Sequence, residues 1–227
     1  MRFYFRTEVL NELTTLWGQA RVSSKMMVIM GRRRVGKTSL AMEFVKDKKF
    51  LYLFAAKKAE ALLCKDYVEV IERELNIKVH GKIETFKEIF SLLMEHAKTH
   101  HFVLIIDEFQ EFLNINPSVY SDLQCIWDLN KNTTKMQLIF IGSIYTLMHK
   151  IFEDSNEPLF GRADRMFTLQ PFTIPQMQKI LKDYQITDLK TLFDFYVISG
   201  GVPKYLDLLL NNNCKTLDDM LDFMVQD

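Results

Sequence analysis

Residues 31–38 read Gly-Arg-Arg-Arg-Val-Gly-Lys-Thr, which fits the pattern G-x-x-x-x-G-K-[ST]. An apolar run, Met26–Met30, precedes this stretch, and an amphipathic segment, Ser39–Val45, follows it. The sequence therefore predicts a buried strand that enters a glycine-bounded loop and continues into a helix. In such a loop backbone N–H groups point into a concavity, and the helix N-terminus adds partial positive charge. We call residues 31–38 the phosphate loop and expect it to bind a polyphosphate.

The last residues of the phosphate loop predict how the polyphosphate is held. Lys37 has the position from which an ammonium group reaches the β- and γ-phosphates, and Thr38 has the position of a hydroxyl that ligates Mg²⁺. The alternative is an ordinary turn with a stray lysine, which the flanking strand and helix disfavour. We expect the nucleotide to be contacted by Gly31, Arg34, Val35, Gly36, Lys37, Thr38 and Ser39.

The composition is that of a globular protein with enough length for a well-buried core. The 227 residues are 48% hydrophobic and 26% charged, and 29 Lys and Arg balance 29 Asp and Glu. Zero net charge does not support a nucleic-acid partner, although a local basic patch stays open. Three scattered cysteines argue against a disulfide framework or a zinc cluster, and no apolar run is long enough for a membrane span. We expect a cytoplasmic protein without a membrane partner.

The pattern of apolar runs predicts the fold class. Five short runs are nearly continuous in Val, Ile, Leu, Phe or Met, which is typical of parallel strands covered on both faces. They are Met26–Met30, Phe50–Phe54, Phe102–Ile106, Leu138–Ile141 and Met166–Leu169. Helical periodicity lies between these runs. We therefore predict an α/β fold, a P-loop three-layer sandwich with a five-stranded, mainly parallel sheet.

The last quarter of the chain has a different pattern. After Pro171 only helical segments follow, with no strand pattern. The predicted helices are Ile174–Tyr184, Leu189–Ile198, Val202–Asn211 and Leu217–Val225. We therefore expect a nucleotide-binding core over residues 1–170 and a small helical lid domain over residues 171–227.

Polar residues at the ends of two predicted strands are candidates for catalysis. Asp107 ends the third apolar run, where a carboxylate can hold Mg²⁺ through water, and Glu108 projects differently and can polarise a water in line with the γ-phosphate. The alternative is a strand end with two solvated acids. Ser143 follows the fourth run, and its hydroxyl can sense the γ-phosphate, cap the helix expected at 144–151, or do both.

Several motifs together resemble the prokaryotic AAA+-type ATPases common in Archaea, which are related to the STAND (signal-transduction) NTPases. The resemblance covers nearly the whole chain. It rests on residues 31–38, on Asp107–Gln110 after its strand, and on Ile141–Ser143, Leu159–Arg162 and Gly200–Tyr205. It implies ATP or ADP with Mg²⁺ as the ligands, and a P-loop core with an extra strand between the two Walker motifs. Members often continue beyond the lid into a further domain, whereas this sequence stops at Asp227, which leaves the downstream activity open.

The resemblance also implies roles for residues far from the phosphate loop. In such proteins the start of the chain and the glycine-proline turn of the lid close on the adenine. We therefore expect adenine-side contacts from Phe5, Arg6, Pro203 and Tyr205, where a proline that merely starts a helix is the alternative for Pro203. Arg162 has the position of an arginine that neutralises γ-phosphate charge, in its own site or a neighbour's. The alternative for Arg162 is a surface salt bridge.

Three functions agree with these features. We expect an ATPase in which Lys37, Glu108, Ser143 and Arg162 act on ATP held with Mg²⁺ by Thr38 and Asp107. The alternatives are a slow nucleotide-dependent switch that presents a partner surface, and a nucleic-acid handling module. A homo-oligomer or a protein partner is compatible with each of them.

Overall fold

The structure of the protein is a computed structural model that describes residues 2–226. In these residues five strands form one sheet in the order β2-β3-β4-β1-β5, and every neighbouring pair is parallel. The strands are β1 (Lys25–Met30), β2 (Phe50–Phe54), β3 (Phe102–Asp107), β4 (Met136–Gly142) and β5 (Arg165–Thr168). The predicted α/β class and all five strands are confirmed, with strand ends shifted by at most two residues.

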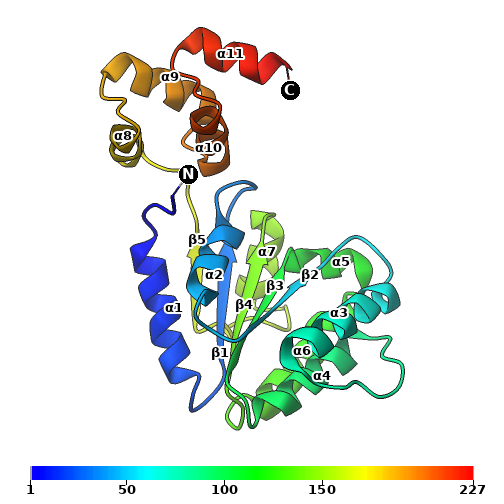
Figure 1. Cartoon of the computed structure of the whole chain (residues 1–227). Helices are drawn as coiled ribbons and strands as arrows, with labels where there is room; N and C mark the ends of the chain where they lie inside the picture. The colour runs from blue at the N-terminus through cyan, green and yellow to red at the C-terminus, as the bar shows by residue number, and fades with distance from the viewer. Residues whose placement is uncertain (1, 227) are drawn as a thin grey trace.

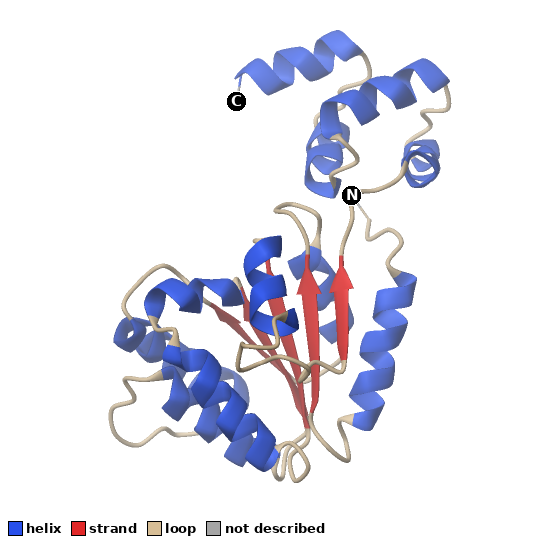
Figure 2. Ribbon diagram, turned by 180° about the vertical axis from the view of Figure 1, so that it is seen from behind, coloured by secondary structure: helices blue, strands red, loops and turns tan. Residues whose placement is uncertain are grey.

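Helices cover both faces of the sheet (Figures 1 and 2). One face carries α1 (Thr7–Gln19) and α2 (Lys37–Val45). The other carries α3 (Glu60–Leu75), α4 (Phe86–Ala97), a 3-10 turn (Phe109–Glu111), α5 (Phe112–Ile115), α6 (Ser118–Asn130) and α7 (Tyr145–Glu153). In β1, Met27 and Ile29 pack under α1 and α2, whereas Met26 and Val28 pack in the opposite cluster. Because both faces are buried, the strand sequences are continuously apolar.

The strand order brings the predicted site together. β4 lies between β1 and β3, as the resemblance implies, so the carboxyl ends of these three strands are neighbours. Met30 at the end of β1 pairs with Gly142 at the end of β4. The phosphate loop, Asp107 and Ser143 therefore lie along one edge of the sheet, which is where open α/β sheets bind ligands.

Four helices follow the sheet and lie beyond the carboxyl ends of its strands (Figure 1). They are α8 (Ile174–Asp183), α9 (Leu189–Ser199), α10 (Pro203–Asn211) and α11 (Leu217–Gln226). Their apolar side chains form a cluster separate from the two that cover the sheet, with Phe195 and Leu206 fully buried in it. The division of the chain at residue 170 stays a prediction, which this separate cluster supports.

The start of the chain lies between the sheet and these four helices (Figures 1 and 2). Tyr4 and Phe5 pack against the apolar cluster of the last four helices. The Tyr4 hydroxyl donates a hydrogen bond of 2.9 Å to Asp183 of α8, and the Phe5 ring lies edge-on to Phe172. The N-terminal segment is therefore fastened to the last four helices.

Among the described helices, none has the length and apolar character needed to cross a membrane.

Candidate nucleotide-binding site

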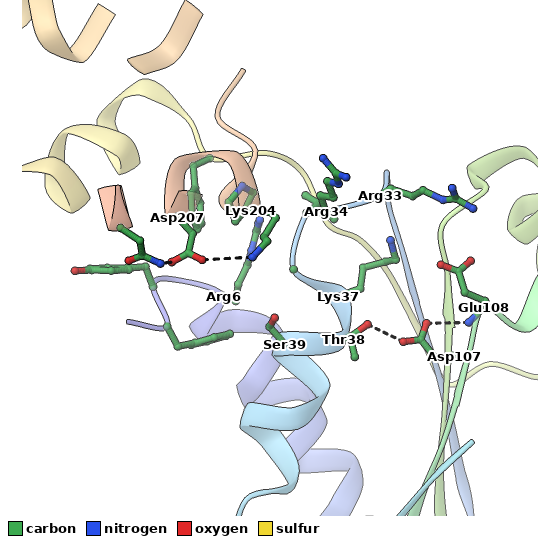
Figure 3. A pocket seen from close by; sticks show the side chains of 17 residues that line it. Arg6, Arg33, Arg34, Lys37, Thr38, Ser39, Asp107, Glu108, Lys204 and Asp207 are labelled. Atoms are coloured by element: carbon green, nitrogen blue, oxygen red, sulfur yellow. Dashed lines mark hydrogen bonds and ion pairs between the residues drawn. The ribbon is translucent and has the colours of Figure 1, made fainter. Parts of the chain in front are cut away.

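A pocket of about 580 Å³ opens where the sheet edge, the N-terminal segment and α10 meet (Figure 3). The phosphate loop and the start of α2 form its floor, and two acidic residues at the end of β3, Asp107 and Glu108, form one wall. Its lining residues are Phe3, Tyr4, Arg6, Arg33, Arg34, Val35, Gly36, Lys37, Thr38, Ser39, Asp107, Glu108, Phe172, Pro203, Lys204, Asp207 and Asn211. The pocket is therefore built from segments at both ends of the chain and from its centre.

The phosphate loop begins directly after Met30, the last residue of β1. Gly31 has φ +149°, and a Cβ there would lie 2.6 Å from the carbonyl oxygen of Leu169, so only glycine fits beside that backbone. Gly36, with φ +93°, precedes Lys37, the first residue of α2. The N-terminus of α2 therefore opens into the pocket, where its free N–H groups favour an anion.

Lys37 is held inside the phosphate loop, with only 6% of its surface exposed. Its Nζ donates hydrogen bonds of 2.7 Å to the carbonyl of Gly31 and 3.0 Å to that of Arg32. Burial lowers the pKa of Lys37, and the nearby Glu108 and Asp107 partly offset this effect. A buried ammonium whose partners are mainly neutral carbonyls fits a polyphosphate, which would supply anionic oxygens.

Asp107 is the best-connected carboxylate of the pocket. Its Oδ2 accepts hydrogen bonds from the Thr38 hydroxyl at 2.6 Å and from the Tyr52 hydroxyl at 2.8 Å, and its Oδ1 accepts one from the Glu108 N–H. Burial and then the charge of Asp107 raise the pKa of Tyr52, so its hydroxyl stays a donor. The hydroxyl of Thr38 and the carboxylate of Asp107 are hard oxygen donors side by side, which fits Mg²⁺.

Glu108 follows β3 in a left-handed conformation, with φ +53°. Its Oε2 accepts a hydrogen bond of 2.7 Å from the Ser143 hydroxyl and a second from the side-chain amide of Gln110. Ser143 does not cap the following helix, because the N-cap of α7 is Ile144 and no side chain caps it. The carboxylate of Glu108 therefore faces the pocket in a fixed orientation, with Ser143 beside it.

At the other end of the pocket Arg6 and Pro203 are both part of the lining. Arg6 has φ +68°, its guanidinium donates to the carbonyl of Gln170, and it lies 5.2 Å from the centre of the Phe172 ring. Burial lowers the pKa of Arg6. Pro203 is the first residue of α10, so it both starts that helix and borders the pocket. Their contact with adenine stays a prediction.

Phe5 and Tyr205 lie next to the pocket but are not part of its lining. Phe5 packs on Phe172, with ring centres 5.7 Å apart. The Tyr205 ring lies 5.1 Å from the guanidinium carbon of Arg34, so it contacts the phosphate loop. Adenine contact by Phe5 or Tyr205 is therefore not favoured by where these rings lie, and it too stays a prediction.

Arg162 lies outside the pocket lining. Its guanidinium forms a two-pronged ion pair with Asp128 of α6, with distances of 2.7 to 3.2 Å. The second arginine of this region, Arg165, pairs with Glu12 of α1 at 3.0 Å. The salt-bridge alternative for Arg162 therefore describes its environment here, while its action on phosphate stays a prediction.

Four residues in or beside the pocket have roles that the sequence did not indicate: Lys204 and Asp207 line it, whereas Tyr52 and Gln110 lie outside the lining and bond its acidic residues. Tyr52 lies in an apolar strand, where nothing marks its hydroxyl as a partner of a carboxylate two strand positions away. Gln110 follows Glu108 closely, and only its proximity to an acidic pair could have suggested a role. Lys204 and Asp207 lie on α10 within 3.8 Å of each other, and Asp207 also accepts a hydrogen bond from Asn211. Their place in the pocket depends on how the last helices dock.

The comparison with curated proteins gives an uncharacterized relative from Methanocaldococcus jannaschii. It is 28% identical over 208 residues, and the match covers 88% of this chain and 44% of that protein. A second uncharacterized protein of the same organism is 36% identical over 67 residues, covering 30% of this chain and 65% of that protein. The chain therefore spans less than two thirds of the length of either relative.

Solved structures share the fold. A Walker-type ATPase of Pyrococcus abyssi has a TM-score of 0.69 at 18% identity, over 99% of this chain and 72% of that one. The ORC2 protein of Aeropyrum pernix, solved as ADPNP-ADP complexes, has a TM-score of 0.69 at 15% identity, over 96% and 67%. A STAND protein of Pyrococcus horikoshii has a TM-score of 0.59 at 17% identity, over 99% and 32%.

The family follows from the sequence itself. Residues 3–209 match the family described as an ATPase domain predominantly from Archaea, and this stretch includes the phosphate loop, the acidic pair after β3 and α10. The predicted resemblance to archaeal ATPases is confirmed. The family supports nucleotide binding by this chain. This chain belongs to the family of ATPase domains found predominantly in Archaea.

Proposed function

We propose that this chain binds ATP with Mg²⁺ and hydrolyses it to ADP and phosphate, coupled to rearrangement of the last four helices. The observation that carries the proposal is the acidic pair beside the phosphate loop. Asp107 is bonded to Thr38 at 2.6 Å, and Glu108 is oriented by Ser143 at 2.7 Å. An ion-holding carboxylate and a candidate base thus lie next to a phosphate cradle.

Each residue has a distinct task in the proposed reaction. The phosphate loop and Lys37 bind the phosphates, while Thr38 and Asp107 would hold Mg²⁺, which neutralises phosphate charge when bound. Glu108 accepts the proton of the attacking water as the bond from the water oxygen to the γ-phosphorus forms. The bond to the bridging oxygen breaks, and its electron pair stays on ADP. Ser143 keeps Glu108 oriented toward the pocket.

A slow nucleotide switch is the second candidate, and one observation favours it. Both the Ser143 hydroxyl and the Gln110 amide donate to the same oxygen of Glu108, Oε2. These donors compete with a water for that oxygen, which would slow proton transfer. A nucleic-acid role has less support, because the net charge is zero. A structure of similar fold, Aeropyrum pernix ORC1, was nevertheless solved in complex with DNA.

The test is Glu108→Gln, which keeps the shape of the side chain and removes the base. We expect single-turnover ATP hydrolysis to fall by about 10²–10⁴-fold, since this is the usual contribution of a general base. Affinity for a fluorescent ATP analogue should stay within about twofold because Glu108 does not hold the phosphates. Glu12→Gln is the control, since Glu12 pairs with Arg165 outside the pocket.

Two other outcomes separate the candidates. Tight ATP binding with one slow turnover in the unaltered protein would favour the switch over a cycling ATPase. Equal turnover in Glu108→Gln and the unaltered protein would remove Glu108 from the mechanism. Absence of ATP binding by the unaltered protein would contradict both functions.

A further inference from the structure

Three consecutive arginines of the phosphate loop, Arg32, Arg33 and Arg34, have different surroundings in the structure. All three are exposed, but only Arg33 and Arg34 line the pocket. Arg34 is directed to α10, where its guanidinium carbon lies 5.1 Å from the centre of the Tyr205 ring. Arg33 therefore differs from Arg32 because it lines the pocket, and from Arg34 because its side chain does not contact the Tyr205 ring of α10.

Arg33 lies on the side of the pocket where the chemistry is proposed. In Figure 3 its side chain extends from the loop above Lys37, on the side of Glu108. The positive charge of Arg33 is close enough to Lys37 to lower the pKa of that lysine, in addition to the larger effect of burial. Two cations thus lie near each other at the phosphate end of the pocket.

Within residues 2–226 no hydrogen bond or ion pair joins the Arg33 side chain to another residue. Its guanidinium presents N–H groups in a fork that matches two phosphate oxygens. A cation without a protein partner beside a second cation is stabilised by an anion with several charges. The terminal phosphate of a nucleotide in the phosphate loop has this chemistry.

We infer that Arg33 binds the terminal phosphate in its own site and stabilises the charge that develops on it during hydrolysis. This inference rests on the proposed function, because it needs a nucleoside triphosphate in the pocket. The inference gives Arg33 the task of neutralising charge on the γ-phosphate, which the resemblance gives to Arg162. Arg162 is committed to Asp128 through three short contacts and lies outside the lining.

The experiment compares Arg33→Ala with Arg32→Ala. Arg32→Ala removes the same charge from the neighbouring position but takes no side chain out of the pocket, so it measures the general electrostatic effect. Affinities for ADP and for a non-hydrolysable ATP analogue are measured by competition with a fluorescent nucleotide. Single-turnover hydrolysis is measured over a hundredfold range of protein concentration.

We expect Arg33→Ala to slow single-turnover hydrolysis by about 10³-fold, the lower end of what such an arginine contributes. Affinity for the ATP analogue should fall by about tenfold relative to ADP, because ADP lacks the terminal phosphate. Arg32→Ala should change both quantities by about threefold at most, as expected for an exposed charge. Because the arginine acts in its own site, the rate per molecule should not rise with protein concentration.

Other results would overturn the inference. Equal loss of ADP and ATP-analogue affinity in Arg33→Ala would mean that Arg33 acts as a general charge. A larger loss of turnover in Arg162→Ala than in Arg33→Ala, with activity that rises with concentration, would assign the task to Arg162 of a neighbouring molecule. If the unaltered protein binds ATP but does not hydrolyse it, the proposed reaction fails, and the ratio of ATP-analogue to ADP affinity still decides the role of Arg33. If it binds no nucleotide, both proposals fail.

Discussion

The two ends of the pocket are built in different ways. At the phosphate end Lys37 and Asp107 are nearly fully buried, and they lie at the carboxyl ends of β1 and β3, two strands of one sheet on either side of β4. At the opposite end Arg6 and Pro203 are half-buried and Lys204 is exposed. These residues come from α10, which is part of the cluster of the last four helices, and from the N-terminal segment, which packs on that cluster.

This difference indicates which end is fixed and which can move. Buried, hydrogen-bonded groups on a packed sheet open only with the whole core, whereas exposed groups on a small separate cluster open at lower free energy. The phosphate end is therefore expected to be preorganised for chemistry. The opposite end is expected to follow the position of α8–α11, so that nucleotide binding and helix movement are coupled there.

The largest expected effect comes from Lys37→Ala, compared with Lys204→Ala at the other end. Removing one partner from a buried, charged hydrogen-bond network costs about 2–5 kcal/mol, so nucleotide affinity should fall by about 30-fold or more. Lys204 is exposed, and its loss should change affinity by about threefold or less. Titration with a fluorescent nucleotide measures both.

The contrast between the two ends of the pocket is wrong if Lys37→Ala binds nucleotide as well as the unaltered protein does. It is also wrong if Lys204→Ala lowers nucleotide affinity more than Lys37→Ala does. Since Lys37 also bonds two loop carbonyls, thermal unfolding without nucleotide is the control. A variant that unfolds at the same temperature but does not bind would place the effect in the site.

The same contrast explains what the sequence could predict. At the phosphate end the functional residues follow directly after apolar strands, and local order along the chain decides their position. The motif at 31–38, the acidic pair after β3 and the serine after β4 could be read in this way. Tyr52 could not, because its bond to Asp107 depends on β2 pairing with β3 in one register, with Phe54 opposite Asp107.

The opposite end could be predicted only in outline. Helical periodicity indicates α8–α11 but not which of their faces borders the pocket, so Lys204, Asp207 and Asn211 were not foreseen. For a similar reason the sequence does not decide between a phosphate and a surface ion pair as the partner of Arg162. Its partner, Asp128, is 34 residues away on α6, and no local pattern joins a loop arginine to a distant helix. Contacts between side chains that are far apart in the sequence are therefore the feature of the site that sequence patterns do not predict.

Gly201→Ala should disrupt the junction between the two ends. Gly201 has φ +69°, and a Cβ there would lie 2.2 Å from the Phe172 carbonyl oxygen. Left-handed strain and the clash together are expected to cost about 3 kcal/mol. The matched control is Gly200→Ala, with φ +56° and no atom within 4 Å of the added Cβ, which should cost only about 1 kcal/mol of strain. Denaturant unfolding measures both, and equal costs would contradict the clash.

Tyr52→Phe tests the fixed geometry of the phosphate end. Losing the hydroxyl that bonds Asp107 Oδ2 should raise the Mg²⁺ concentration for half-maximal nucleotide binding by about tenfold, as expected for a residue that positions a metal ligand. Affinity measured in EDTA should stay the same. The control is Tyr67→Phe, since the Tyr67 hydroxyl bonds the carbonyl of Phe54 instead. An unchanged Mg²⁺ requirement in Tyr52→Phe would show that Asp107 needs no support from β2.

The smallest expected effect is at the contact that joins the two ends, between Arg34 and Tyr205. Their cation–π pair at 5.1 Å is accompanied by a hydrogen bond from the Lys204 N–H to the Arg34 carbonyl. A double-mutant cycle of Arg34→Ala and Tyr205→Leu should give a coupling of about 0.5–1 kcal/mol in nucleotide affinity, since both side chains are partly exposed to solvent. The cycle is needed because Arg34 also lines the pocket, so the single variant mixes two effects. A coupling near zero would mean that the phosphate loop does not sense the last four helices through these two side chains.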